Sequence, residues 1–193
     1  MPSALAADFY RRDPRAVGPD LLNKLVVRGT RVGRIVEVEA YCGAEDPGSH
    51  AYRGMTRRNA TMFGRAGLLY VYLTYGMHHC ANVVCGDAGE GLAVLLRGLT
   101  PVAGLDEMRA LRVKARSDRE LCAGPGRICQ ALGLDRSTDG ADLVTGDRGV
   151  LVVDDGTPPP EVWGVSVRIG LTAGADSPWR YYVPGATGLS RPG

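Results

Sequence analysis

The stretch VGRIVEVEAY at residues 32–41 decides the fold, because apolar and polar side chains alternate along it as they do in a half-buried β-strand. A Gly29-Thr30 turn joins it to a second apolar run at residues 25–28. The two runs therefore predict a β-hairpin, and the chain is expected to build a sheet around its longer arm.

Alternation also sorts the side chains of this strand between two faces. Val36 and Val38 are predicted to share one face. The other face is expected to carry Ile35, Glu37, Glu39 and Tyr41.

Outward from this strand, the remaining patterns predict a mixed, β-rich body. Gly 27 and Pro 12 imply many turns and short elements. Strands are predicted at 68–75, 78–84, 92–97, 150–153, 165–169 and 180–183, and a Gly76-Met77 turn is expected between the first two. Helices are predicted at 13–22, 105–116 and 125–132. With 193 residues, we expect one domain spanning residues 1–193.

The cysteines and histidines exclude several classes of protein. The five cysteines are an odd number without a C-x-x-C pair, so buried free thiols are predicted rather than disulfides or a zinc ribbon. His78, His79 and Cys80 are adjacent on a predicted strand and cannot converge on one ion. No metal and no cofactor is expected.

The hydropathy pattern excludes a membrane protein. No apolar run approaches the ~20 residues of a membrane span, and residues 1–10 lack a signal-like core. We expect no membrane partner and a cytosolic location.

The net charge of +2 is too small to indicate nucleic acid, but its distribution is uneven. Residues 51–65 hold four arginines and no acidic residue. Guanidinium groups suit phosphate oxygens, although such a stretch also fits an ordinary solvated loop. Lysine occurs only at Lys24 and Lys114, which disfavours Schiff-base chemistry.

Glu37 and Glu39 are the first candidates for chemistry. Their α-carbons should lie about 7 Å apart on one strand face, which invites a glycosidase interpretation. Paired glycosidase carboxyls flank the bond from opposite sides, however, so only one of the two is expected to act. The alternative is an exposed face with two solvated glutamates.

Aromatic side chains gather on the same strands. The faces of tyrosines at 41, 70, 72 and 75 can sandwich a planar base, or can simply pack in a core. His50, in a polar loop, fits a base- or phosphate-contacting group as well as a surface histidine.

Several motifs occur in a fixed order along nearly the whole chain. They are VEVEAY (36–41), EDPGSH (45–50), Arg58-Asn59, Met62-Phe63, LYVYLTYGM (69–77), Asn82-Val83, VLLR (94–97), Gly124-Pro125 and residues 129–132. In these motifs the chain resembles the alkyladenine (3-methyladenine, or methylpurine) DNA glycosylase family, from about residue 8 to residue 191. The resemblance implies a compact α+β domain around a curved, mostly antiparallel, barrel-like sheet flanked by helices, with a protruding hairpin that enters the minor groove of DNA.

The resemblance also implies roles for individual residues. Glu39 matches the general base that deprotonates a water attacking C1′ of a damaged nucleotide, and Arg97 matches the arginine that holds this carboxylate. Tyr41, His50 and Tyr72 match the walls around the flipped-out base, and Asn82 matches the asparagine that crowds the 2-amino group of guanine. Tyr75 matches the wedge at the hairpin tip. Met77 beside it and the loop arginines Arg53, Arg57 and Arg58 are the other residues expected to contact DNA.

Two departures put part of this transfer in question. Met55 and Arg57 stand where the family often has a basic residue and a proline, so phosphate contacts in the loop are expected to differ. Asn23 also stands where a glycine is frequent. None of these positions touches Glu39.

The family likeness predicts a metal-free base-excision repair enzyme acting on duplex DNA that contains alkylated or deaminated purines. It leaves the order of preference among 3-methyladenine, 7-methylguanine, hypoxanthine and ethenoadenine open. Two other functions remain to be separated from it, a non-catalytic DNA binder and a nucleoside hydrolase. We expect a monomer, near the nucleoid in a bacterial cytoplasm or in the nucleus of a eukaryote.

Overall fold

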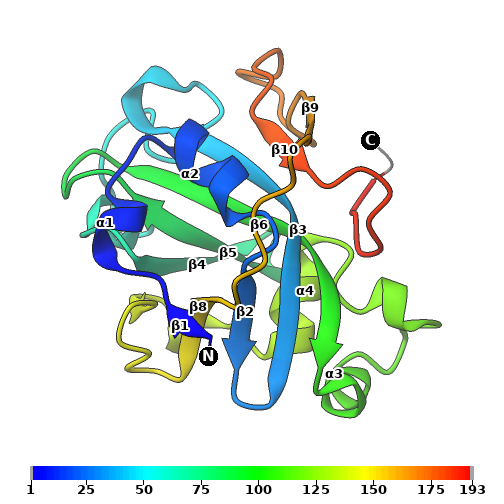
Figure 1. The fold of residues 1–193 in the computed structure, drawn as a ribbon. Coiled ribbons are helices and arrows are strands. Elements are labelled where there is room, and N and C mark those ends of the chain that lie inside the picture. Colours follow the sequence, from blue (N-terminus) through cyan, green and yellow to red (C-terminus); the bar gives the residue numbers. More distant parts are fainter. Residues whose placement is uncertain (1, 192–193) are drawn as a thin grey trace.

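Strand β3 (Arg31–Cys42) runs through the middle of the sheet, in a computed structural model that describes residues 2–191 (Figure 1). Strand β6 (Leu92–Ala103) pairs along one edge of β3. The other edge is divided, because β2 (Leu25–Arg28) pairs with its first part and β10 (Arg180–Tyr182) with residues 37–39. The predicted hairpin at 25–41 is confirmed.

The remaining strands extend this arrangement into a curled, ten-stranded sheet whose pairings are all antiparallel. The main path runs β1-β8-β2-β3-β6-β5-β4-β7, and β9 pairs only with β10. The bounds are β1 Ser3–Ala4, β4 Leu68–Thr74, β5 His78–Cys85, β7 Ala141–Asp142, β8 Val150–Asp154 and β9 Gly164–Ser166. The fold is thus the expected single α+β domain, although β9 is shorter than the strand predicted at 165–169.

In the described part of the chain, four α-helices accompany the sheet: α1 (Ala7–Tyr10), α2 (Pro14–Leu21), α3 (Leu105–Leu111) and α4 (Pro125–Leu132). Short 3-10 turns lie at Gly43–Glu45, Ala60–Phe63, Asp118–Glu120 and Arg136–Thr138. Helix α2 begins after Asp13, whose side chain accepts from the backbone N–H of Arg15. Helix α4 ends at Gly133 in the left-handed conformation. The prediction that a helix continues to residue 116 is wrong: α3 ends at Leu111, which is half-exposed, and Val113 beyond it is 83% exposed, so no apolar face is buried there.

The two faces of the sheet have different roles. One face carries Val38, Val71 and Leu96, which belong to the main core together with residues of α2 and α4 such as Ile128. The five cysteines are buried free thiols, as predicted. The opposite face carries a smaller cluster around Tyr70, and it also carries the acidic side chains of β3.

The pairing of β3 with β6 is irregular at three places, two of which lie beside the glutamates. Val38 pairs with Leu96 and Glu37 with Gly98, so Arg97 is an extra residue in β6. The next pair joins Ile35 and Leu99, which makes Val36 an extra residue in β3. Each bulge reverses the direction of the side chains that follow it. Ile35 therefore lies in the main core with Val38, and its predicted place beside the glutamates is wrong.

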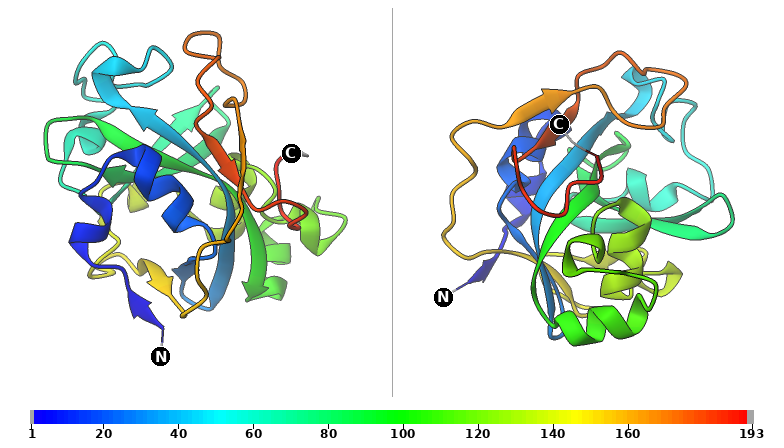
Figure 2. Two further views of the ribbon diagram at one scale, coloured as in Figure 1. Left: turned by 45° about the horizontal axis from the view of Figure 1, so that its top comes forward. Right: turned by 90° about the vertical axis from the view of Figure 1, so that its right-hand side faces the viewer.

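The β4–β5 hairpin projects from the body of the molecule (Figure 2, right). Its turn centres on Tyr75 and Gly76, both at positive φ, instead of the predicted Gly76-Met77 pair. Such turns need positive φ at both central residues, and glycine accepts this freely. Tyr75 and Met77 are consequently 86% and 71% exposed at the tip.

The C-terminal part of the chain returns to the middle of the sheet. After β10, residues 183–191 run beside β3 and β6 (Figure 2). Gly188 lies so close that a Cβ atom on it would meet the carbonyl oxygen of Leu99 at 2.2 Å. Within residues 2–191, no helix is long and apolar enough to cross a membrane.

Candidate active site

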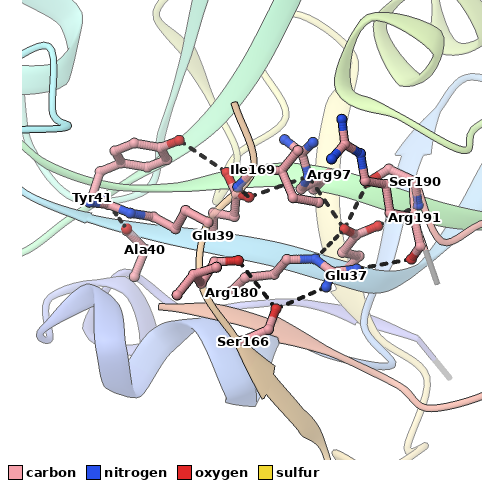
Figure 3. A network of polar contacts seen from close by, with 12 residues as sticks. Glu37, Glu39, Ala40, Tyr41, Arg97, Ser166, Ile169, Arg180, Ser190 and Arg191 are labelled. Atoms are coloured by element: carbon pink, nitrogen blue, oxygen red, sulfur yellow. Dashed lines mark hydrogen bonds and ion pairs between the residues drawn. The ribbon is translucent and has the colours of Figure 1, made fainter. Parts of the chain in front are cut away.

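Glu39 is fully buried on the face of the sheet opposite the main core. Its Oε1 accepts a hydrogen bond of 2.7 Å from the backbone N–H of Ile169, and its Oε2 accepts one of 3.0 Å from the hydroxyl of Tyr41 (Figure 3). The alternative of a solvated glutamate face is thereby excluded. Burial raises the pKa of Glu39, and the nearby charge of Arg97 opposes this rise.

Arg97 shares the face of Glu39 by alternation, and as the extra residue of the β6 bulge it lies between the positions that pair with Glu37 and Val38. Its Nε lies 3.3 Å from Oε1 of Glu37 and 3.3 Å from Oε1 of Glu39. This Nε–H is buried and makes no hydrogen bond to any residue among 2–191. The guanidinium is therefore shared electrostatically between two carboxylates.

Glu37 has its own set of partners, so the two glutamates are not equivalent. Arg180 donates from Nε to Oε1 of Glu37 at 2.7 Å. Ser190 donates from its backbone N–H to Oε2 and, at 2.8 Å, from its hydroxyl to Oε1. Figure 3 shows this cluster beside Glu39. Glu37 therefore accepts three hydrogen bonds from protein groups, whereas Glu39 accepts two.

A pocket opens on the Tyr41 side of Glu39. It is lined by Tyr41, Gly48, His50, Met62, Tyr70, Tyr72, Asn82 and Leu171. The structure therefore brings the four predicted base-contacting residues, Tyr41, His50, Tyr72 and Asn82, to one cavity. Glu39 is not among the lining residues and reaches the pocket through the hydroxyl of Tyr41.

The rings inside the pocket are in contact with one another. His50 and Tyr72 meet edge to face with centroids 4.4 Å apart, and Nδ1 of His50 lies 3.3 Å from the hydroxyl of Tyr70. Partial withdrawal from water and the charge of Arg58 lower the pKa of His50. A planar ligand between His50 and Tyr72 would need His50 to move away.

The loop that carries His50 is organised by Asn59. Its side-chain amide donates to the carbonyl oxygens of His50 and Gly54, and its Oδ1 accepts from Thr56. Arg58 donates to the carbonyl of Leu73 in the hairpin, at 3.0 Å. Arg53 and Arg57 are exposed on the same loop.

A second buried ion pair supports the pocket wall. Arg168 is bidentate on Asp46, and both side chains are fully buried. The guanidinium lies over the ring of Tyr41 at 4.6 Å and over Trp179 at 4.9 Å. Arg168 also precedes Ile169, so one segment fixes both Tyr41 and the backbone donor to Glu39.

Comparison with known proteins gives one consistent answer. Residues 8–187 match the methylpurine-DNA glycosylase family. The chain is 51% identical to a protein of Burkholderia lata over 98% of this chain and 92% of that one. It is 46% identical to proteins of Streptomyces avermitilis (93% and 87%) and Methanoculleus marisnigri (97% and 98%). All three are named provisionally as 3-methyladenine DNA glycosylases.

The chain belongs to the methylpurine-DNA glycosylase family. It is a monofunctional DNA glycosylase, a hydrolase of N-glycosyl bonds in DNA. Within residues 2–191 this glycosylase has no group of three or more His, Cys, Asp or Glu side chains placed to hold a metal ion.

Sequence reasoning missed several residues of the glycosylase site. Ile169, Arg180 and Ser190 follow long, irregular connections, and their contacts with β3 span 130 to 153 residues. Their neighbourhood in sequence holds no signal for these contacts. Asp46 did stand in a recognised motif, but its buried partner Arg168 could not be paired with it from spacing.

Proposed function

We propose that this glycosylase removes alkylated purines from duplex DNA with a water molecule that Glu39 deprotonates. The observation that carries the proposal is the position of Glu39, a buried carboxylate hydrogen-bonded to Tyr41 at the edge of an aromatic pocket. Oε2 accepts only the Tyr41 hydroxyl among residues 2–191. Its remaining lone pair is available to a water.

In the proposed reaction, one proton is transferred, one bond forms and one bond breaks. Glu39 takes one proton from the water, the resulting hydroxide forms a bond to C1′, and the N-glycosidic bond breaks with its electron pair on the base. A purine methylated on a ring nitrogen carries a positive charge and leaves as a neutral molecule. It needs no proton from the enzyme. The oxocarbenium-like sugar would be stabilised by the negative charge of Glu39.

Recognition of the lesion is proposed to use the same pocket. The electron-rich faces of Tyr41 and Tyr72 should attract a cationic base by roughly 0.5 to 2 kcal/mol. The lowered pKa of His50 favours its neutral ring, which avoids repulsion of such a base. Asn82 donates to the carbonyl of Tyr70, which fixes its side chain at the pocket wall. We propose that it crowds the 2-amino group of guanine.

Access to the base requires that it leave the duplex, at a cost of a few kcal/mol. We propose that Tyr75 fills the resulting gap and that Met77 lies beside it in the minor groove. Arg53, Arg57 and Arg58 would contact phosphates from the neighbouring loop. In this proposal the protein acts as a monomer on nucleoid DNA.

The decisive experiment replaces Glu39 by Gln. We expect release of methylated purines from a duplex, under single-turnover conditions, to fall by at least about a hundredfold. Affinity for the same duplex should be retained. Glu161→Gln is the matched control, because Glu161 is an exposed glutamate outside the pocket. Unchanged release in the Glu39 variant would refute the mechanism.

A further test separates water from an amine as the attacking group. Lys24 is buried and paired with Asp154, and Lys114 is exposed outside the pocket. We therefore expect an intact abasic strand as product. A covalent protein–DNA adduct trapped with borohydride would contradict this.

A further inference from the structure

The proposed mechanism assigns no role to Glu37, although this carboxylate lies beside Glu39 and accepts three hydrogen bonds. It is fully buried, it accepts from Arg180 and twice from Ser190, and it lies 3.3 Å from the Nε of Arg97. Burying a second charge beside Glu39 is costly unless that charge is paired. A purely apolar residue at this position would avoid the cost.

The geometry identifies what Glu37 does to Arg97. The Nε of Arg97 is equally far from one oxygen of each glutamate and is hydrogen-bonded to neither. With only one carboxylate within reach, an arginine would settle into a direct, charge-assisted hydrogen bond with it. Such a bond would occupy a lone pair of Glu39 and weaken it as a proton acceptor.

We propose that Glu37 is a positioning residue, which holds Arg97 midway between the two carboxylates and so keeps Glu39 free to accept a proton from water. This inference rests on the proposed function. Arg180 and Ser190, which donate hydrogen bonds to Glu37, hold the Glu37 side chain in this position. Close packing of Gly188 against β6 holds Ser190 in place.

The charged and titratable groups facing Glu39 come from several elements. They are Arg97 on β6, Glu37 and Tyr41 on β3, Cys80 on β5 and Arg168 before Ile169. Of these, Glu37 raises the pKa of Glu39, whereas Arg97 lowers it. Loss of the Glu37 charge would remove a repulsion and would also release Arg97 toward Glu39. Both changes make Glu39 a weaker base.

Two single variants should therefore act in opposite directions. Glu37→Gln should move the acid limb of the pH–rate profile to lower pH and reduce the plateau rate by about tenfold. Arg180→Gln leaves the Glu37 charge in place with one partner fewer, so Glu37 should draw Arg97 away from Glu39. The acid limb should then move to higher pH.

The measurement is single-turnover release of tritiated methylpurines from a duplex treated with a methylating agent, followed from acid to neutral pH. Cationic lesions leave without a proton, so the acid limb reports on the base alone. If Glu37 had a merely structural role, both variants would have a lower melting temperature, and their acid limbs would either stay in place or move in the same direction. Either result would overturn the inference.

Loss of one buried partner can prevent folding, so a double variant completes the test. Glu37→Gln combined with Arg180→Gln removes both charges of the pair and leaves neither unpaired. We expect the acid limb of this double variant to lie at lower pH than that of the wild type. An unshifted acid limb would refute the role of Glu37. Failure of the proposed function itself would appear differently, as unimpaired release by Glu39→Gln.

Discussion

The hydroxyl of Tyr41 donates a hydrogen bond of 3.0 Å to Oε2 of Glu39. The bond joins a wall of the pocket to the carboxylate behind it, since Tyr41 lines the cavity and Glu39 does not. A base that stacks on the ring of Tyr41 is thereby positioned relative to Glu39. In the proposed function, recognition and chemistry therefore share one side chain.

Tyr41→Phe should isolate the contribution of this hydrogen bond, because the ring is kept and only the hydroxyl is lost. The hydrogen bond lowers the pKa of Glu39, so its loss should raise that pKa and move the acid limb of the pH–rate profile to higher pH. On the acid side, we expect release to fall about fivefold, the equivalent of one hydrogen bond. The pH dependence of single-turnover release measures both effects. A move of the acid limb to lower pH would contradict the role given to the Tyr41 hydroxyl.

The strands that carry the site could be predicted from the sequence, because their signals are local. Alternation placed Glu37 and Glu39 on one face, and it separated Leu69 and Val71 from Tyr70 and Tyr72. It failed at Ile35, where a bulge intervenes. A bulge depends on how two distant strands pair, so the pattern of one strand alone does not contain it.

The same limit applies to the polar supports of the site. The resemblance named Glu39, Tyr41 and Arg97, and the structure brings these three together. It said nothing of Arg168 or Arg180, because an arginine is by default expected to be solvated. Only the folded chain reveals that both are buried against carboxylates.

Asp46→Asn should destabilise the fold strongly. It would leave Arg168 fully buried without its charge partner, at a cost of about 3 to 5 kcal/mol in the free energy of unfolding. Asp20→Asn is the matched control, since the Arg12–Asp20 pair is partly exposed and should contribute less than about 1 kcal/mol. Urea denaturation measures both. Equal effects would mean that burial does not decide the strength of these pairs.

Glu39→Gln should make the protein more stable at neutral pH while it removes activity. The folded-state pKa of Glu39 is raised, so the stability that this group contributes is complete below its unfolded pKa and is lost as pH rises through the folded value. Glutamine has no proton to lose and keeps that stability. We expect the melting temperature of the variant to exceed that of the wild type at pH 7.

The melting temperatures of the two proteins should converge as pH falls toward the unfolded pKa of glutamate, about 4.3. Glu161→Gln, in an exposed position, should produce no difference that changes with pH. A Glu39 variant that is less stable than the wild type at neutral pH would show that its ion pair outweighs its burial.

Tyr75 is presented by a turn that holds it at φ +48, a conformation that side-chain-bearing residues rarely adopt. The ring is 86% exposed, so it makes little contribution to the fold, and strain of this kind is typical of functional positions. Tyr75→Ala should leave the free energy of unfolding within about 0.5 kcal/mol of the wild type. Release of methylated purines from a duplex should fall about tenfold or more, because nothing then fills the gap left by the extruded base.

The same variant should be almost unaffected on a single-stranded oligonucleotide that carries the same lesions, because no stacked neighbour across the helix has to be replaced there. Val162→Ala, another exposed apolar truncation, should change neither rate. An enzyme acting on free nucleosides would not distinguish the two DNA forms and would not respond to the loss of Tyr75. Equal losses on duplex and single strand would instead mean that Tyr75 contacts the lesion itself, and the minor-groove role of the hairpin would have to be abandoned.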